Sequence, residues 1–113
     1  MVFKLKEKCL KSQNKEVYYG AILNKEIQDV YLGMSILEPG ESRTEGPGKG
    51  HEEIFYVLEG QLKIIINDRE IILNEGEAYF IPNGFKNTVT NLSSKRSYLI
   101  MAGGHPQAHS HTH

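Results

Sequence analysis

The sequence predicts an all-β domain of the sandwich or barrel class. Short segments rich in Ile, Val, Tyr and Phe recur along the chain, and these residues favour the pleated, half-buried surface of a sheet. Gly, Pro, Asn and Asp separate the segments and supply turns, and no segment shows the periodicity of a convincing helix. Parallel strands would need helical crossovers, so closely spaced strands without helices indicate an antiparallel architecture.

Each predicted strand is an apolar or alternating run bounded by turn residues. The predicted strands are 17–23, 30–37, 53–58, 62–66, 70–73, 78–81, 88–91 and 98–102. Residues 1–15 suit either a short helix or an edge strand. We therefore divide the chain into an N-terminal segment (1–15), a barrel domain (16–102) and a His-rich C-terminal tail (103–113).

Composition excludes several classes of function. The chain has 113 residues and a net charge of −1, which predicts one domain without a basic surface for nucleic acid or anionic membrane. No apolar run is long enough to span a bilayer, and the charged N-terminus is unlike a signal peptide. Cys9 has no second cysteine to pair with, which fits a reducing compartment. We expect a cytoplasmic protein.

A set of turn residues over 76–91 carries a family resemblance. Gly76, Pro82, Gly84 and Asn91 fall on the marks of G-x5-P-x-G-x2-H-x3-N, and the histidine position holds Asn87. This segment resembles the second signature of the cupin superfamily, whose histidine is a metal ligand.

The first cupin signature, G-x5-H-x-H-x3-4-E-x6-G, is also present in part. Gly40, Glu53 and Gly60 match it, and Glu53 takes the place of the family's ligand glutamate. The two histidine positions hold Gly46 and Gly48 in one spacing, or Pro47 and Lys49 in the other. The resemblance implies a small single-domain cupin, folded as a double-stranded β-helix (a jelly-roll-like barrel), with degenerate metal-ligand positions.

The donor set predicts no metal in the usual position. Cupins hold a metal with three histidines and a glutamate, whereas this chain offers Glu53 and the weak neutral donor Asn87. We predict no cofactor, with a divalent transition metal as the alternative.

Five residues are candidates for a ligand-binding pocket: Lys49, His51, Glu53, Tyr79 and Asn87. His51 precedes Glu53 by two positions, and residues at i and i+2 of a strand point the same way, so the pair suits a pocket mouth. His51 is then a candidate base or substitute ligand, or otherwise a loop histidine. Arg43 is either an anion clamp or a surface arginine beside Glu41 and Glu45.

The C-terminal tail has a separate potential for metal. His109, His111 and His113 alternate, and in extended form their imidazoles would project from one side, a spacing that chelates copper, nickel or zinc. The alternatives are a disordered tail, or a tail that folds back and supplies imidazoles to the barrel.

The pattern of segment 53–58 predicts that part of the sheet surface is covered. Ile54, Tyr56 and Leu58 share one face while Phe55 and Val57 share the other, so both faces are apolar. We expect a homodimer that buries one sheet, or else coverage by the N-terminal segment.

We expect a binding module for a small polar metabolite, without metal. The alternatives are a metal-independent isomerase or epimerase acting on a sugar or keto acid, or a metalloprotein that uses the tail histidines. In the enzyme, burial would raise the pKa of Glu53, the catalytic base. A Glu53 that faces an open cavity near another titratable group favours the enzyme; a Glu53 held in a salt bridge favours the binding module.

Overall fold

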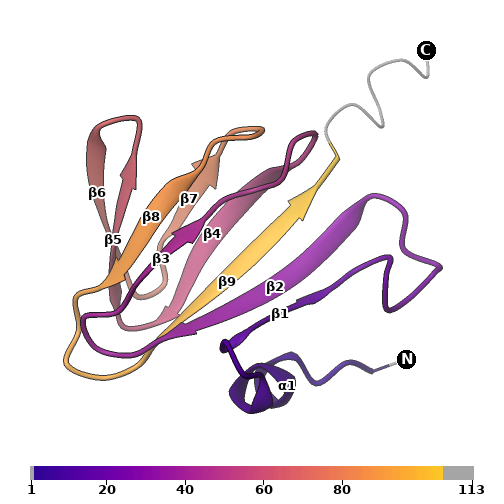
Figure 1. Ribbon diagram of the computed structural model, residues 1–113, viewed down its shortest axis with the longest axis horizontal. Helices are drawn as coiled ribbons and strands as arrows, with labels where there is room; N and C mark the ends of the chain where they lie inside the picture. Colours follow the sequence, from indigo (N-terminus) through magenta and orange to yellow (C-terminus); the bar gives the residue numbers. More distant parts are fainter. Residues whose placement is uncertain (1, 106–113) are drawn as a thin grey trace.

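Two antiparallel sheets face each other in a jelly roll (Figure 1). The structure, a computed structural model, describes residues 2–105. Within that range the larger sheet has the strand order β1-β2-β9-β4-β7 and the smaller one β3-β8-β5-β6. The elements are α1 (Leu5–Lys11), β1 (Glu16–Tyr19), β2 (Val30–Leu37), β3 (Ser42–Glu45), β4 (Glu52–Glu59), β5 (Gln61–Ile66), β6 (Arg69–Asn74), β7 (Ala78–Ile81), β8 (Asn87–Asn91) and β9 (Ser97–Gly104). The predicted fold class is confirmed.

Most strands lie where the sequence predicts them, and β2 and β7 have the predicted bounds. The first strand ends at Tyr19, because residues 20–29 form a turn-rich loop. Strand β3 was not predicted because the inward positions of this short segment carry the charged residues Arg43 and Glu45. The N-terminal segment forms a helix, α1, one of the two alternatives for that segment.

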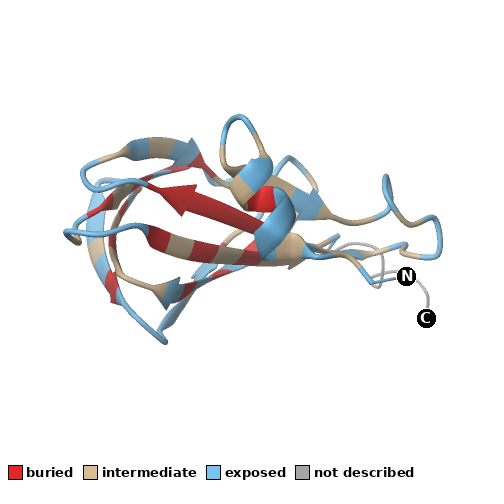
Figure 2. Ribbon diagram, turned by 90° about the horizontal axis from the view of Figure 1, so that it is seen from below, coloured by how far each residue is buried: buried red, intermediate tan, exposed pale blue. Residues whose placement is uncertain are grey.

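The apolar core fills the closed end of the barrel. Buried and exposed residues alternate along the strands, as expected for a sheet with one face on the core (Figure 2). Phe55 and Val57 of β4 point inward and are fully buried. The rest of this cluster is Leu37, Leu62, Ile64, Ile66, Leu73, Ile81, Val89, Leu99 and Met101.

Helix α1 covers part of the outer surface of the larger sheet. Cys9 of the helix is buried with Met34 and Ile36 of β2, and its thiol donates a hydrogen bond to the Met34 carbonyl at 3.4 Å. The N-terminal segment therefore covers this part of the sheet. Apolar side chains beyond the helix stay exposed and form what we call the outer apolar face: Leu32, Ile54, Tyr56, Leu58 and Phe80.

The opposite end of the barrel is open. There β2 begins beside the end of β9, with Val30 paired to Gly104, and the 20–29 loop joins β1 to β2. The His105 amide donates to the Asp29 carbonyl at 3.2 Å, which ties the end of β9 to this loop. Across residues 2–105, no helix is long and apolar enough to cross a bilayer.

Candidate functional site

A cavity of about 630 Å³ lies at the open end of the barrel. Its size is within the usual range for small-molecule sites. Strands β1, β2 and β4 and the 20–29 loop contribute most of its wall. The lining residues are Tyr18, Gly20, Ala21, Ile22, Leu23, Gln28, Val30, Tyr31, Gly46, Gly48, His51, Glu53 and His105.

Glycines on the inward face make room for the two tyrosines of the cavity. A methyl group at Gly33 of β2 would lie 2.5 Å from the Tyr18 ring, and one at Gly103 of β9 would overlap the Tyr31 phenol. Tyr18 lies across Gly33, with its hydroxyl 3.6 Å from the Met101 sulfur. Because Gly33 of β2 and Gly103 of β9 have no side chain, the rings of Tyr18 and Tyr31 can pack directly against these two strands.

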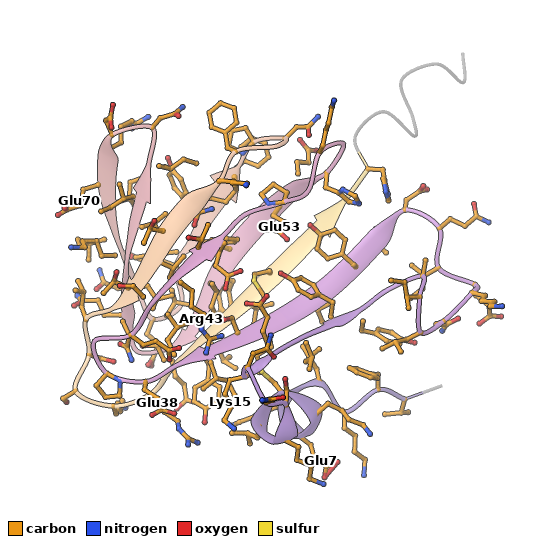
Figure 3. All side chains as sticks on the ribbon, in the orientation of Figure 1. Glu7, Lys15, Glu38, Arg43, Glu53 and Glu70 are labelled. Atoms are coloured by element: carbon orange, nitrogen blue, oxygen red, sulfur yellow. The ribbon has the colours of Figure 1, made fainter. Side chains whose placement is uncertain are left out.

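Glu53 is the buried acid of the cavity, and it lies on β4 between the sheets (Figure 3). Its side chain is only 3% exposed. The Tyr31 hydroxyl donates to Oε2 at 2.6 Å, while Oε1 has no hydrogen-bond partner within residues 2–105. Over the same residues, Glu53 forms no salt bridge with lysine or arginine.

Burial sets the ionisation of this pair. It raises the pKa of Glu53, and the Tyr31 hydrogen bond opposes that rise only in part. Burial also raises the pKa of Tyr31, and the hydrogen bond to Glu53 adds to the increase. Tyr31 therefore donates to a carboxyl group whose pKa lies above its ordinary value.

His51 stands beside Glu53 at the cavity wall. Its Nδ1 is buried and has no hydrogen-bond partner among the described residues. Its ring meets Tyr31 edge-on at 5.7 Å between centroids and lies 4.0 Å from the ring of His105. The structure thus brings His51 and Glu53 to one cavity, where Tyr31 contacts both of them.

The positions expected for metal-binding histidines border this site. Gly46 and Gly48 line the cavity, and the buried Asn87 lies against Gly46: a methyl group at Gly46 would be 3.4 Å from Asn87 Nδ2. Neither side-chain polar atom of Asn87 has a partner within residues 2–105. Over the same range, no three His, Cys, Asp or Glu side chains converge as metal ligands would. One carboxyl group and one amide do not suit the family's metal.

The other sequence candidates lie elsewhere. Lys49 is exposed in the loop between β3 and β4 and does not line the cavity. Tyr79 of β7 packs against the apolar core and lines a separate cavity of about 320 Å³. His109, His111 and His113 lie outside the described residues.

Arg43 belongs to a structural network behind the cavity. Its guanidinium donates to Ser35 Oγ at 2.8 Å and to the Ile36 carbonyl at 2.6 Å, and it pairs with Glu41 at 3.0 Å. Ser35 in turn donates to the buried Glu45 at 3.2 Å. Burial raises the pKa of Glu45, and its neighbour Glu16 raises it further. Arg43 is thus neither a free surface arginine nor a ligand clamp.

Sequence reasoning missed Tyr18 and Tyr31. The signal lay in the alternation of β2, where Tyr31, Gly33 and Ser35 occupy inward positions that would be apolar in a closed core. Polar and glycine residues on an inward face indicate an open or functional end.

Comparison with protein families matches residues 33–103 to the cupin domain. The chain is a cupin. A curated relative, the tetracenomycin polyketide synthase protein TcmJ of Streptomyces glaucescens, is 34% identical over 61 residues, which cover 54% of this chain and 41% of TcmJ. The β-D-galactosidase Rv1717 of Mycobacterium tuberculosis is 23% identical over 78 residues, covering 69% of this chain and 66% of Rv1717.

Solved structures support the same fold. The crystal structure of BH2720 from Bacillus halodurans has a TM-score of 0.69 and 15% identity, covering 95% of this chain and 82% of BH2720. A cupin protein from Bacteroides fragilis, BF4112, has a TM-score of 0.65 and 19% identity, with 83% of this cupin and 79% of BF4112 covered. At such identities the likeness concerns the fold.

Proposed function

We propose that this cupin binds a small polar metabolite in the cavity at the open end, through Glu53 and His51 and without a metal at the family's usual position. The observation that carries the proposal is the pair of unpartnered buried atoms, Glu53 Oε1 and His51 Nδ1, at the cavity wall. A buried polar atom without a partner costs about 1–3 kcal/mol. Such groups are rare in folded proteins unless water or a ligand completes them.

Binding is tested by amide NMR titration with a library of small sugars, hydroxy acids and phenols. A ligand of the cavity shifts the amides of Gly46 and Gly48, which line it. We expect Glu53→Leu to weaken that ligand about tenfold or more, the equivalent of about 1.4 kcal/mol. Tyr79→Phe, outside the cavity, should leave its affinity unchanged. A library in which no compound shifts Gly46 or Gly48 would refute the proposal.

The second candidate is a metal-independent isomerase or epimerase with Glu53 as base. The arrangement expected of the enzyme is the one observed: Glu53 lines the cavity, has no salt bridge within residues 2–105, and has Tyr31 and His51 close by. Burial also raises the pKa of Glu53 toward the range of a general base. Such an enzyme would exchange a carbon-bound proton of its substrate with solvent.

Deuterium exchange distinguishes the enzyme from the binding module. The protein is incubated in D2O with each ligand that the titration identifies, and the ligand is examined by proton NMR. Catalysis is supported if the wild type causes a carbon-bound proton signal of the ligand to disappear and Glu53→Gln does not. Binding without exchange supports the binding module alone.

The names of the two curated relatives do not agree on a ligand. One concerns a polyketide synthase and the other a galactosidase, and this chain spans 41% and 66% of their lengths. The class of ligand must therefore be argued from the cavity of this chain.

The outer apolar face supports a homodimer. Phe80 and Ile54 are paired across β7 and β4 and are 51% and 49% exposed, beyond the area that α1 covers. If this face is the interface, Phe80→Glu should convert a dimer to a monomer in analytical ultracentrifugation. Ile72→Glu, at an exposed position of the smaller sheet, should not. A wild-type monomer at high protein concentration would contradict the dimer.

A further inference from the structure

The cavity wall is poor in positive charge. None of the residues that line it, within the part of the chain that the structure describes, is lysine or arginine. The inward-facing arginine nearest the site, Arg43, is held by Glu41, Ser35 and the Lys15 and Ile36 carbonyls. An anionic ligand would therefore have no lysine or arginine side chain in the described wall to neutralise it.

Acidic groups add to this effect. Glu53 stands in the wall itself and is 3% exposed. After burial, the negative charge of Glu16 also raises the pKa of Glu53, so the wall is unfavourable for further negative charge. Bringing another carboxylate or a phosphate into this region would bury like charges together, which is unfavourable at low dielectric.

Much of the remaining cavity wall is apolar or aromatic. Tyr18 and Tyr31 meet edge-on at 5.7 Å between ring centroids and form an aromatic wall. At the 20–29 loop, Ile22, Leu23 and Val30 also line the cavity while remaining 97%, 49% and 66% exposed. Apolar side chains that border a site and stay exposed suit contact with an apolar ligand surface.

We infer that the cavity selects an uncharged ligand with an apolar or aromatic body, whose hydroxyl or carbonyl group reaches Glu53 and His51, and that it excludes anions. This inference rests on the proposed binding function and names the class of ligand. The Glu53 carboxyl group accepts a hydrogen bond from a hydroxyl group of the ligand, through the oxygen Oε1 that has no partner in residues 2–105. The body of the ligand lies along Ile22, Leu23 and Val30.

The test compares two probes that differ in charge, 2-naphthol and 2-naphthoate, with methyl β-D-galactoside as an uncharged probe that lacks an apolar body. Each is titrated into the full chain at pH 7.5 and followed by the amides of Gly46 and Gly48. We expect 2-naphthol to bind at least about tenfold more tightly than 2-naphthoate. Equal or tighter binding of 2-naphthoate would overturn the inference.

The galactoside separates failure of the inference from failure of the proposed function. If only the galactoside shifts the cavity amides, the cavity binds small molecules, but the inference that its ligand has an apolar body is wrong. If none of the three probes shifts them at millimolar concentration, the inferred class falls, and the wider library then decides the binding function by itself.

A variant pair tests the physical cause. Glu53→Gln removes the charge in the wall and should bring the affinities of the two naphthyl probes within about threefold of each other. Glu52→Gln removes the same charge from the neighbouring position of β4, on the opposite face of the strand, and should leave the selectivity as in the wild type. Selectivity that survives Glu53→Gln would contradict an electrostatic origin.

Discussion

Asn91 and Asn87 lie on the same strand, β8, face the same interior and are both buried, yet their surroundings are opposite. Asn91 donates to the Leu37 and Lys95 carbonyls at 2.9 and 2.8 Å and accepts from Ser97 Oγ at 2.7 Å. Asn87 has no hydrogen-bond partner in the described part of the chain. At the closed end, buried polar atoms form hydrogen bonds within the protein. At the open end, the buried polar atoms of Asn87 have no hydrogen-bond partner among the described residues and remain available to a ligand or water.

Strand β4 shows the same contrast two positions apart. Phe55 and Glu53 both point inward and are nearly fully buried. Phe55 packs in the apolar cluster, while Glu53 keeps one oxygen unpaired at the cavity. Substitutions at the closed end should therefore reduce stability, and substitutions at the open end should change binding at little loss of stability.

The largest effect is expected from Phe55→Ala. Truncation of a fully buried phenylalanine leaves a cavity in the core and should lower the free energy of unfolding by about 3–5 kcal/mol. Urea denaturation measures the change, with the exposed Phe85→Ala as the matched control. A loss below about 1 kcal/mol would mean that the closed end is not the stabilising core.

The asparagine pair gives the next largest effect. Asn91→Ala leaves several buried groups without partners and should lower the free energy of unfolding by about 2–3 kcal/mol. Asn87→Ala removes an amide that bonds to nothing in residues 2–105 and should change it by about 0.5 kcal/mol or less. Equal losses in the two variants would remove the contrast between the ends of the barrel.

The sequence was sufficient for the framework of the fold. Two local features could be read from the sequence without knowing how the strands pair. One is the turn glycines Gly76 and Gly84, both at positive φ, and the other is the apolar alternation of β4 and β5. Strand β3 escaped prediction because its inward Arg43 and Glu45 are stabilised by partners on β1 and β2, which are distant in sequence.

The site was predictable only where it follows from a motif or from strand geometry. The sequence placed His51 and Glu53 on the same face of a strand because they are two residues apart, and both line the cavity. Tyr31 could not be found in this way, because its contact with Glu53 depends on the pairing of β2 and β4 with β9. Lys49 was proposed as a polar residue of the pocket, but it is exposed in the loop between β3 and β4 and does not line the cavity.

The pH dependence of stability gives a smaller effect at the open end. Because the pKa of Glu53 is raised in the folded protein, the folded state holds a proton that the unfolded state loses above about pH 4.5. The stabilising contribution of the proton is thus full below that pH and is lost as pH rises through the folded pKa. Glu53→Gln should flatten the decline in unfolding free energy that the wild type shows as the pH rises above about 4.5.

Urea denaturation at several pH values measures this slope. The exposed Glu70→Gln, which removes the same charge from β6, serves as the control and should keep the wild-type slope. A wild-type stability that rises between pH 5 and 8, with Glu53→Gln removing the rise, would show that Glu53 is stabilised as a carboxylate instead.

The smallest chemical change is Tyr31→Phe, which removes one hydroxyl group. Tyr31 donates to Glu53 at 2.6 Å, a bond that favours the carboxylate, so its loss should raise the pKa of Glu53 further. The loss of stability should stay below about 1.5 kcal/mol. Carbon-13 NMR of the Glu53 carboxyl group follows the titration directly, with Tyr56→Phe on the outer face of the same strand as control. A pKa that falls in Tyr31→Phe would show that the phenol bonds to the neutral acid, so that the tyrosine, rather than burial, would keep Glu53 protonated.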